Sequence, residues 1–172
     1  MAIRTILHYP DKRLRNKAEP VREVTPEIRA LVDDMAETMY AAPGVGLAAP
    51  QIGEAKRIFV IDVAPSDEPS DLRVFINPEI IARNGVTTWE EGCLSFPGLH
   101  EDIERAESVT VRAMGVDGKT FELSAEGLLA IAIQHENDHL DGTLMIDRVS
   151  LLKRRMMDRE MRKRQASQQA RV

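Results

Sequence analysis

The segment at residues 125–140 constrains the fold more than any other part of this chain. Residues 128–133 would be apolar on nearly every side of a helix, which is typical of a helix enclosed by other elements. Ser124 is suited to cap the start of such a helix, and Gly142 is suited to end it. We therefore expect a central helix with sheet packed around it.

The second half of this predicted helix carries two histidines, His135 and His139, and Glu136 follows the first. Residues four apart lie on one face of a helix, so both imidazoles can bind the same metal ion. Glu136 would then lie within reach of a water molecule at that ion. A pair of surface histidines has the same spacing, but three buried polar groups are costly without partners. The pattern therefore favours a metal-dependent hydrolytic site.

Two histidines are too few ligands, because a catalytic site of this kind uses three protein ligands and an open position. The sequence offers Cys93, His8, His100 and many carboxylates as the third. Cys93 follows a glycine and is expected at a turn or strand edge. A lone cysteine is also typical of a small buried apolar residue, or of a nucleophile paired with His135. Spacing alone leaves these alternatives open.

A glycine-containing segment at residues 44–51 reads GVGLAAPQ. It lacks the Gly-Lys-Ser/Thr ending of a phosphate-binding loop. Its two glycines favour the close approach of another backbone, such as a peptide that adds to a sheet edge. Gln51, at its end, could donate an amide N–H to a developing oxyanion.

The remaining pattern predicts strands followed by helices rather than a regular alternation of the two. Apolar residues at helical spacing predict a helix over residues 25–41, with Thr25 as its cap and Pro26 in its first turn. The other expected elements are strands at 1–7, 57–63, 74–76, 109–114 and 120–123, and a helix at 150–166. Asp117-Gly118 predicts a hairpin turn. This order indicates an α+β fold of antiparallel sheets around the central metal-binding helix, with a C-terminal helix.

The 172 residues suit one compact domain, and their charge is distributed unevenly. Residues 153–172 carry eight Lys or Arg and two acids, whereas residues 1–152 carry 15 bases and 26 acids. We expect a catalytic domain over 1–152 and a basic helical extension of it over 153–172. The extension is equally consistent with contact with a polyanion and with a solvated helix.

The sequence also predicts where the protein acts. Its N-terminus lacks the charged start and apolar core of a signal peptide, and no apolar run is long enough to span a bilayer. The single cysteine, Cys93, excludes an internal disulfide framework. We expect a cytoplasmic protein that does not associate with a membrane.

Three segments resemble the signature motifs of peptide deformylase, in the same order and at similar separation. They are GVGLAAPQ at residues 44–51, EGCLS at residues 91–95 and QHENDHL at residues 134–140. YPDKRLR at residues 9–15 also resembles this family, so the likeness extends to about residue 152. It implies a metal-dependent hydrolase that removes the formyl group from the N-terminal formylmethionine of nascent polypeptides and releases formate.

The resemblance also implies the metal site. Cys93, His135 and His139 would be the ligands of one ion per chain. Ferrous iron (Fe2+) is the usual metal of this bacterial-type family, and Zn2+ or Ni2+ can replace it. Glu136 would transfer protons, while Gln51 and the backbone N–H of Leu94 would stabilise the oxyanion.

Substrate contacts and partners follow from the same resemblance. The expected substrate-binding residues are Gly44, Val45, Gly46, Trp89, Arg105, Leu128 and Ile131. Trp89 is bulkier than the aliphatic residue often found at its position. The basic C-terminal helix would contact the ribosome near the exit tunnel, and the protein would be a monomer.

Two other functions compete with this interpretation. An HExxH zinc metallopeptidase would use the same helix, although such enzymes complete their site with His, Glu or Asp rather than Cys93. A non-enzymatic ribosome-associated module would keep the basic tail and a structural or decayed metal site.

Overall fold

The structure is a computed structural model that describes residues 2–170. Within this range the chain forms three α-helices, seven strands and three short 3-10 turns. In chain order these are Lys12–Arg15 (3-10), α1 (Pro26–Ala41), β1 (Gly46–Ala48), Ala49–Ile52 (3-10), β2 (Ile58–Ile61), β3 (Arg73–Asn84), β4 (Thr87–Cys93), β5 (Phe96–Arg105), β6 (Ser108–Met114), β7 (Thr120–Glu126), α2 (Gly127–Leu140), Met145–Arg148 (3-10) and α3 (Leu151–Ala170).

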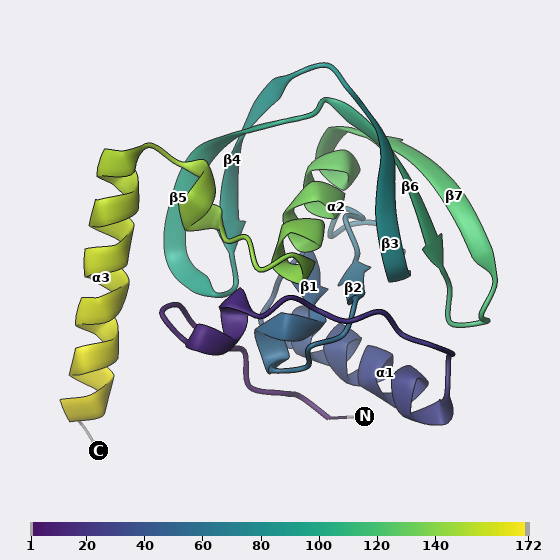
Figure 1. Ribbon diagram of the computed structural model, residues 1–172, viewed down its shortest axis with the longest axis horizontal. Helices are drawn as coiled ribbons and strands as arrows, with labels where there is room; N and C mark the ends of the chain where they lie inside the picture. The colour runs from purple at the N-terminus through teal and green to yellow at the C-terminus, as the bar shows by residue number, and fades with distance from the viewer. Residues whose placement is uncertain (1, 171–172) are drawn as a thin grey trace.

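Two antiparallel sheets enclose the central helix. Five strands form one sheet in the order β1-β2-β3-β6-β7, and β4 pairs with β5 in a separate hairpin. Figure 1 shows α2 between the hairpin and the larger sheet, with α3 on the far side of β5. The predicted α+β architecture, with its central helix and C-terminal helix, is confirmed.

Helix α2 is held by apolar contacts with the larger sheet. Ile133 is fully buried in a cluster that also contains Phe59 and Phe75. The rings of these two phenylalanines lie 4.8 Å apart. Because α2 is covered on several sides, its second half is buried although it is polar.

The predicted start of α2 is wrong by two residues. Ser124 and Ala125 belong to β7, and the Ser124 hydroxyl lies 3.1 Å from that of Thr110 instead of capping a helix. The helix begins at Gly127, whose φ of 63° lets the chain turn directly from strand into helix. The predicted end is confirmed, since α2 stops at Leu140 and Gly142 follows it with φ 75°.

The prediction for α1 is also confirmed. The Thr25 side chain accepts a hydrogen bond from the backbone N–H of Ile28, and Pro26 occupies the first turn. The predicted apolar stripe is buried: Ile28, Leu31, Val32, Met35 and Met39. This stripe packs against β2 and places the residues after α1 beside α2.

Two predicted strands differ from the structure. Residues 2–7 form no strand, because their backbone donors bond to scattered partners, such as the Asp34 and Thr38 side chains, rather than to a neighbouring strand. The strand predicted at 74–76 continues as β3 to Asn84. It passes Asn77 and Pro78 through an irregularity in its pairing with β6, where Asn77 adopts φ 52°.

The β4–β5 hairpin has no strong pattern in the sequence. Its strands carry many acids, and only Glu91, Phe96, Ile103 and Arg105 are buried along them.

Helix α3 begins at Leu151 and extends to Ala170, beyond the predicted end at residue 166. The expected boundary after residue 152 therefore falls inside α3, whose Met157 and Met161 are buried against the rest of the protein.

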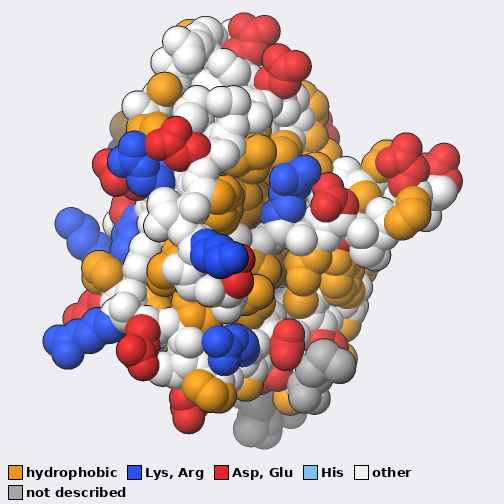
Figure 2. All heavy atoms as spheres, turned by 90° about the vertical axis from the view of Figure 1, so that its right-hand side faces the viewer, with side chains coloured by type: hydrophobic (Ala, Val, Ile, Leu, Met, Phe, Trp, Pro, Cys, Tyr) orange, Lys and Arg blue, Asp and Glu red, His pale blue; other side chains and the backbone are white. Residues whose placement is uncertain are grey.

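The described helices include none that is both long and apolar enough to cross a membrane. Seen from the side of β6 and β7, hydrophobic side chains gather in the middle of the face and charged side chains surround them (Figure 2).

We expect Ile133→Ala to lower the free energy of unfolding by about 2–5 kcal/mol, because it leaves a cavity between α2 and the sheet. Urea unfolding followed by circular dichroism measures this change. Val86→Ala is the control, since Val86 is 69% exposed and its loss should change stability by less than about 0.5 kcal/mol. Equal effects of the two substitutions would contradict the described packing of α2.

Candidate active site

Three side chains from two elements meet beside α2. Cys93 ends β4, while His135 and His139 lie one turn apart on α2. Their sulfur and ring nitrogen atoms all lie within 4.8 Å of one another, and Cys93 Sγ is 3.4 Å from His139 Nε2. His8 and His100, the other candidates for a third ligand, line the neighbouring cavity but are not in this group.

The three residues fit a divalent metal ion. A thiolate and two imidazoles suit zinc, iron and nickel, and three protein ligands leave a further position open. His139 is buried, and its burial together with the nearby His135 lowers its pKa, so the imidazole is neutral, the form that binds a metal. Burial also opposes protonation of His135, but Cys93 and Glu91 hold its pKa well above the ordinary value. A bound cation would displace that proton.

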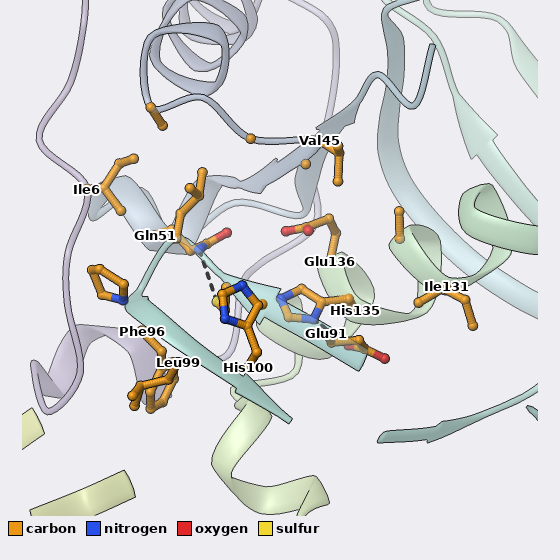
Figure 3. Close-up of a pocket in the computed structure, with 18 of the residues that line it drawn as sticks. Ile6, Val45, Gln51, Glu91, Phe96, Leu99, His100, Ile131, His135 and Glu136 are labelled. Atoms are coloured by element: carbon orange, nitrogen blue, oxygen red, sulfur yellow. Dashed lines mark hydrogen bonds and ion pairs between the residues drawn. The ribbon is translucent and has the colours of Figure 1, made fainter. Parts of the chain in front are cut away.

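Glu91 on β4 orients His135. Its Oε1 lies 2.9 Å from His135 Nδ1, which leaves Nε2 of that ring available to a metal (Figure 3). Burial alone would raise the pKa of Glu91, but hydrogen bonds from Arg105 and His135 outweigh it and hold that pKa below its usual value. Glu91 is therefore an anion that fixes the ring and favours its metal-binding orientation.

A chain of alternating charges continues behind Glu91. Arg105, at the end of β5, donates two hydrogen bonds of 2.8 and 2.9 Å to Glu91 and one of 2.7 Å to Asp138 on α2. Asp138 also accepts two bonds, of 2.7 and 3.0 Å, from Arg148. The chain thus ties the β4–β5 hairpin to the metal-binding helix.

Arg105 was expected to contact substrate, but the structure places it elsewhere. Its side chain is only 3% exposed and does not line the cavity, so Arg105 is placed to hold Glu91 and Asp138 rather than to contact substrate. Sequence reasoning missed the role of Glu91. Its place two residues before Cys93 was the only signal for that role.

Glu136 is buried next to the three possible ligands. Its Oε1 has no hydrogen-bond partner within residues 2–170, and burial raises its pKa to about 7. A Cβ atom at Gly46 would lie 2.6 Å from Glu136 Oε2, so only glycine lets β1 approach this carboxyl group so closely. Glu136 is therefore free to exchange a proton with a molecule in the site.

The amide of Gln51 is fixed on the other side of the cluster. Its Oε1 accepts a hydrogen bond from the Ala48 backbone at 2.9 Å, and its Nε2 donates one to the Ser95 hydroxyl at 3.0 Å. These bonds direct the Nε2 group toward Cys93 Sγ, which lies 3.8 Å away (Figure 3). Leu94 directly follows Cys93, and its side chain packs against Gly44.

A cavity of about 620 Å³ opens over these groups. Six of the seven expected substrate-binding residues line it: Gly44, Val45, Gly46, Trp89, Leu128 and Ile131. In Figure 3, Ile131 and Val45 lie on one side of His135, whereas Phe96 and Leu99 lie on the other. The sequence did not predict that Phe96 and Leu99 line the cavity, because the only indication of it is that they closely follow the Cys93 motif.

Comparison with known proteins identifies the family. The family model described as polypeptide deformylase matches residues 3–155. The chain belongs to the peptide deformylase family. It is 56% identical over 165 residues to a peptide deformylase of Acidobacterium capsulatum. The aligned region covers 96% of this chain and 97% of that protein.

Solved deformylase structures have the same fold. A peptide deformylase from Legionella pneumophila superposes with a TM-score of 0.89 at 47% identity, covering 99% of both chains. One from Ehrlichia chaffeensis in complex with actinonin gives a TM-score of 0.91 at 38% identity, covering 95% of this chain and 98% of the other.

The predicted activity is confirmed by this membership. The chain is a metal-dependent hydrolase that removes the formyl group from the N-terminal formylmethionine of nascent polypeptides. Neither the metallopeptidase nor the non-enzymatic module is favoured.

We expect Arg105→Ala to lower the free energy of unfolding by about 3–5 kcal/mol, because it leaves the buried Glu91 without a counterion. Arg112→Ala is the matched control. Arg112 pairs with Glu122 where both side chains are about half exposed, so its loss should cost at most about 1 kcal/mol. Urea unfolding of the two variants checks the difference, and equal costs would refute the structural role of Arg105.

Proposed function

We propose that this deformylase binds one ferrous ion through Cys93, His135 and His139. The observation that carries this proposal is the meeting of these three ligand atoms within 4.8 Å, beside a buried carboxyl group that has no partner within residues 2–170. When bound, the metal acts as a Lewis acid that polarises the formyl carbonyl and lowers the pKa of water. Zinc or nickel can occupy the same donor set, because thiolate and imidazole bind all three metals.

Glu136 moves the protons in this proposal. It accepts a proton from the water that attacks the formyl carbon and then delivers a proton to the departing amine. A pKa of about 7 suits both steps, since the group can hold or release a proton near neutral pH. The carboxyl group lies directly against Gly46 of β1.

Gln51 and Leu94 stabilise the negative charge that develops on the formyl oxygen. The Gln51 amide is already oriented by Ala48 and Ser95, so it needs no rearrangement during the reaction. The Leu94 backbone N–H adds a second donor next to Cys93. Loss of one such donor typically lowers kcat by about 10²–10³-fold.

The substrate backbone adds to the free edge of β1. This strand lies at the end of the five-stranded sheet and pairs with β2 on one side only. A peptide beside Gly44 and Gly46 would be an additional strand, with its formyl group directed toward Glu136. The methionine side chain would enter the apolar part of the cavity formed by Val45, Trp89, Leu128 and Ile131.

Formate release from formyl-Met-Ala-Ser tests the activity and the metal together. We expect metal-free protein to be inactive, and iron added without oxygen to give a higher kcat/KM than zinc. Equal or greater activity with zinc would contradict the choice of iron. Failure to release formate with any metal would contradict the proposed chemistry.

Two substitutions serve as controls for the residue roles. Glu136→Ala should abolish formate release while the bound metal stays near one ion per chain, because Glu136 is proposed as a base and not as a ligand. Cys93→Ser should instead weaken metal binding, since a hydroxyl is a poor substitute for a thiolate. Metal analysis of both purified proteins separates the two roles, and loss of metal from Glu136→Ala would reverse them.

We also propose that α3 binds ribosomal RNA near the exit tunnel, and that the protein acts there as a cytoplasmic monomer. Several cations of this helix pair with nearby acids: Lys153 with Glu101, Arg154 with Asp147, Arg162 with Asp158 and Arg164 with Glu160. Arg155, Arg159 and Lys163 are exposed and have no ion pair within residues 2–170. Their four-residue spacing places them on one face of α3, which is free to contact phosphates.

Replacing Arg155, Arg159 and Lys163 together by alanine should weaken ribosome binding and leave hydrolysis of formyl-Met-Ala-Ser unchanged. Each lost phosphate contact should reduce the dependence of log affinity on log salt by about one. Sedimentation with ribosomes over a range of salt concentrations measures both quantities. Unchanged affinity would refute the role of this face.

A further inference from the structure

Helix α3 contributes to the wall of the substrate cavity from behind. Its Met157 and Met161 are buried in an apolar cluster with Phe96, and Leu99 packs against the same cluster. Phe96 and Leu99 also line the cavity. One face of α3 therefore supports residues whose other side faces the substrate space.

Tyr9 provides a second link between α3 and this wall. Its ring stacks on Phe96 with centroids 5.1 Å apart, and its hydroxyl donates a hydrogen bond to Asp158 of α3. The backbone N–H of Tyr9 also donates to the Ser95 carbonyl at 3.0 Å. Tyr9 thus connects the helix to Ser95 and Phe96, two and three residues after Cys93.

Arg164 provides the third and most direct link. Its Nη1 donates a hydrogen bond to the backbone carbonyl of Pro97, and its Nε donates one of 3.0 Å to Glu160 on the same helix. Pro97 and Gly98 line the cavity and lie in β5 where its pairing with β4 is irregular, and Gly98 adopts φ 76°. The guanidinium is therefore held by α3 and in turn holds this irregular part of β5 through Pro97.

We propose that Arg164 is a positioning residue for substrate, which fixes the Pro97–Gly98 segment of β5 and thereby shapes the end of the cavity away from Ile131. This inference rests on the proposed function, in which Ile131 helps to bind the methionine side chain. The residues that follow methionine must then leave that pocket, and the wall from Phe96 to Leu99 is available to them (Figure 3). Arg164 acts on those residues through Pro97 and touches no reacting atom.

The proposal predicts an effect on binding rather than on chemistry. An interaction present equally in the bound substrate and the transition state changes KM and leaves kcat unchanged. In Arg164→Ala we expect KM for formyl-Met-Ala-Ser to rise about 3- to 10-fold, as for the loss of one or two hydrogen bonds. KM for formyl-Met-amide, kcat and metal content should stay at wild-type values, because the groups around Glu136 are unaffected.

Three further variants make this test specific. Arg164→Lys retains one donor for the Pro97 carbonyl and should restore most of the affinity for the longer peptide. Tyr9→Phe keeps the stacking on Phe96 but loses the bond to Asp158, and should raise KM for the longer peptide by a smaller factor. Arg29→Ala removes the same charge from an exposed position on α1 and should change neither substrate.

Steady-state kinetics of all variants on the two substrates decides the matter. An unchanged KM for formyl-Met-Ala-Ser in Arg164→Ala would overturn the proposal, and so would an equal loss of activity on both substrates, which indicates a merely structural role. A wild-type protein that cleaves neither substrate would instead refute the proposed function.

Discussion

The buried ion pair between Glu91 and Arg105 holds the catalytic centre together. It joins β4 to β5 and, through Asp138, joins both strands to α2. Removing these charges from water carries a large desolvation cost, which their short hydrogen bonds to one another offset. Because Glu91 also bonds to His135, the same pair that closes the hairpin onto α2 fixes the ring of a proposed metal ligand.

Glu136 departs from this rule of paired burial. Its Oε1 has no hydrogen-bond partner within residues 2–170, and neither has Oδ1 of the adjacent Asn137. Burial without a partner costs stability and raises the pKa of Glu136 to about 7. Burying Glu136 without a partner lowers the stability of the fold but keeps a proton acceptor available in the site. The apolar contacts of α2 with the larger sheet offset this loss of stability.

Much of the site could be predicted because its signals are local or carried by short motifs. The four-residue spacing of His135 and His139 needs only a helix to bring both rings together. The position of Arg105 was missed, because nothing near it in the sequence indicates that Glu91 and Asp138 lie on either side of it. The start of α2 was misplaced for a similar reason. Pairing of Ser124 with Thr110 on β6 outweighed its preference for capping a helix.

The sequence by itself determined the chemistry of this protein: a helical histidine pair with an adjacent carboxylate, a cysteine in a motif of its own, and a glutamine after a glycine-rich segment. The tertiary structure decided how these groups work together. It placed Cys93, rather than His8 or His100, next to the histidines, and it set α3 behind the cavity wall. The physical reason is the range of the interactions. Helix caps and periodic faces depend on residues a few positions apart, whereas these contacts join segments more than 40 residues apart and form only when both sheets close around α2.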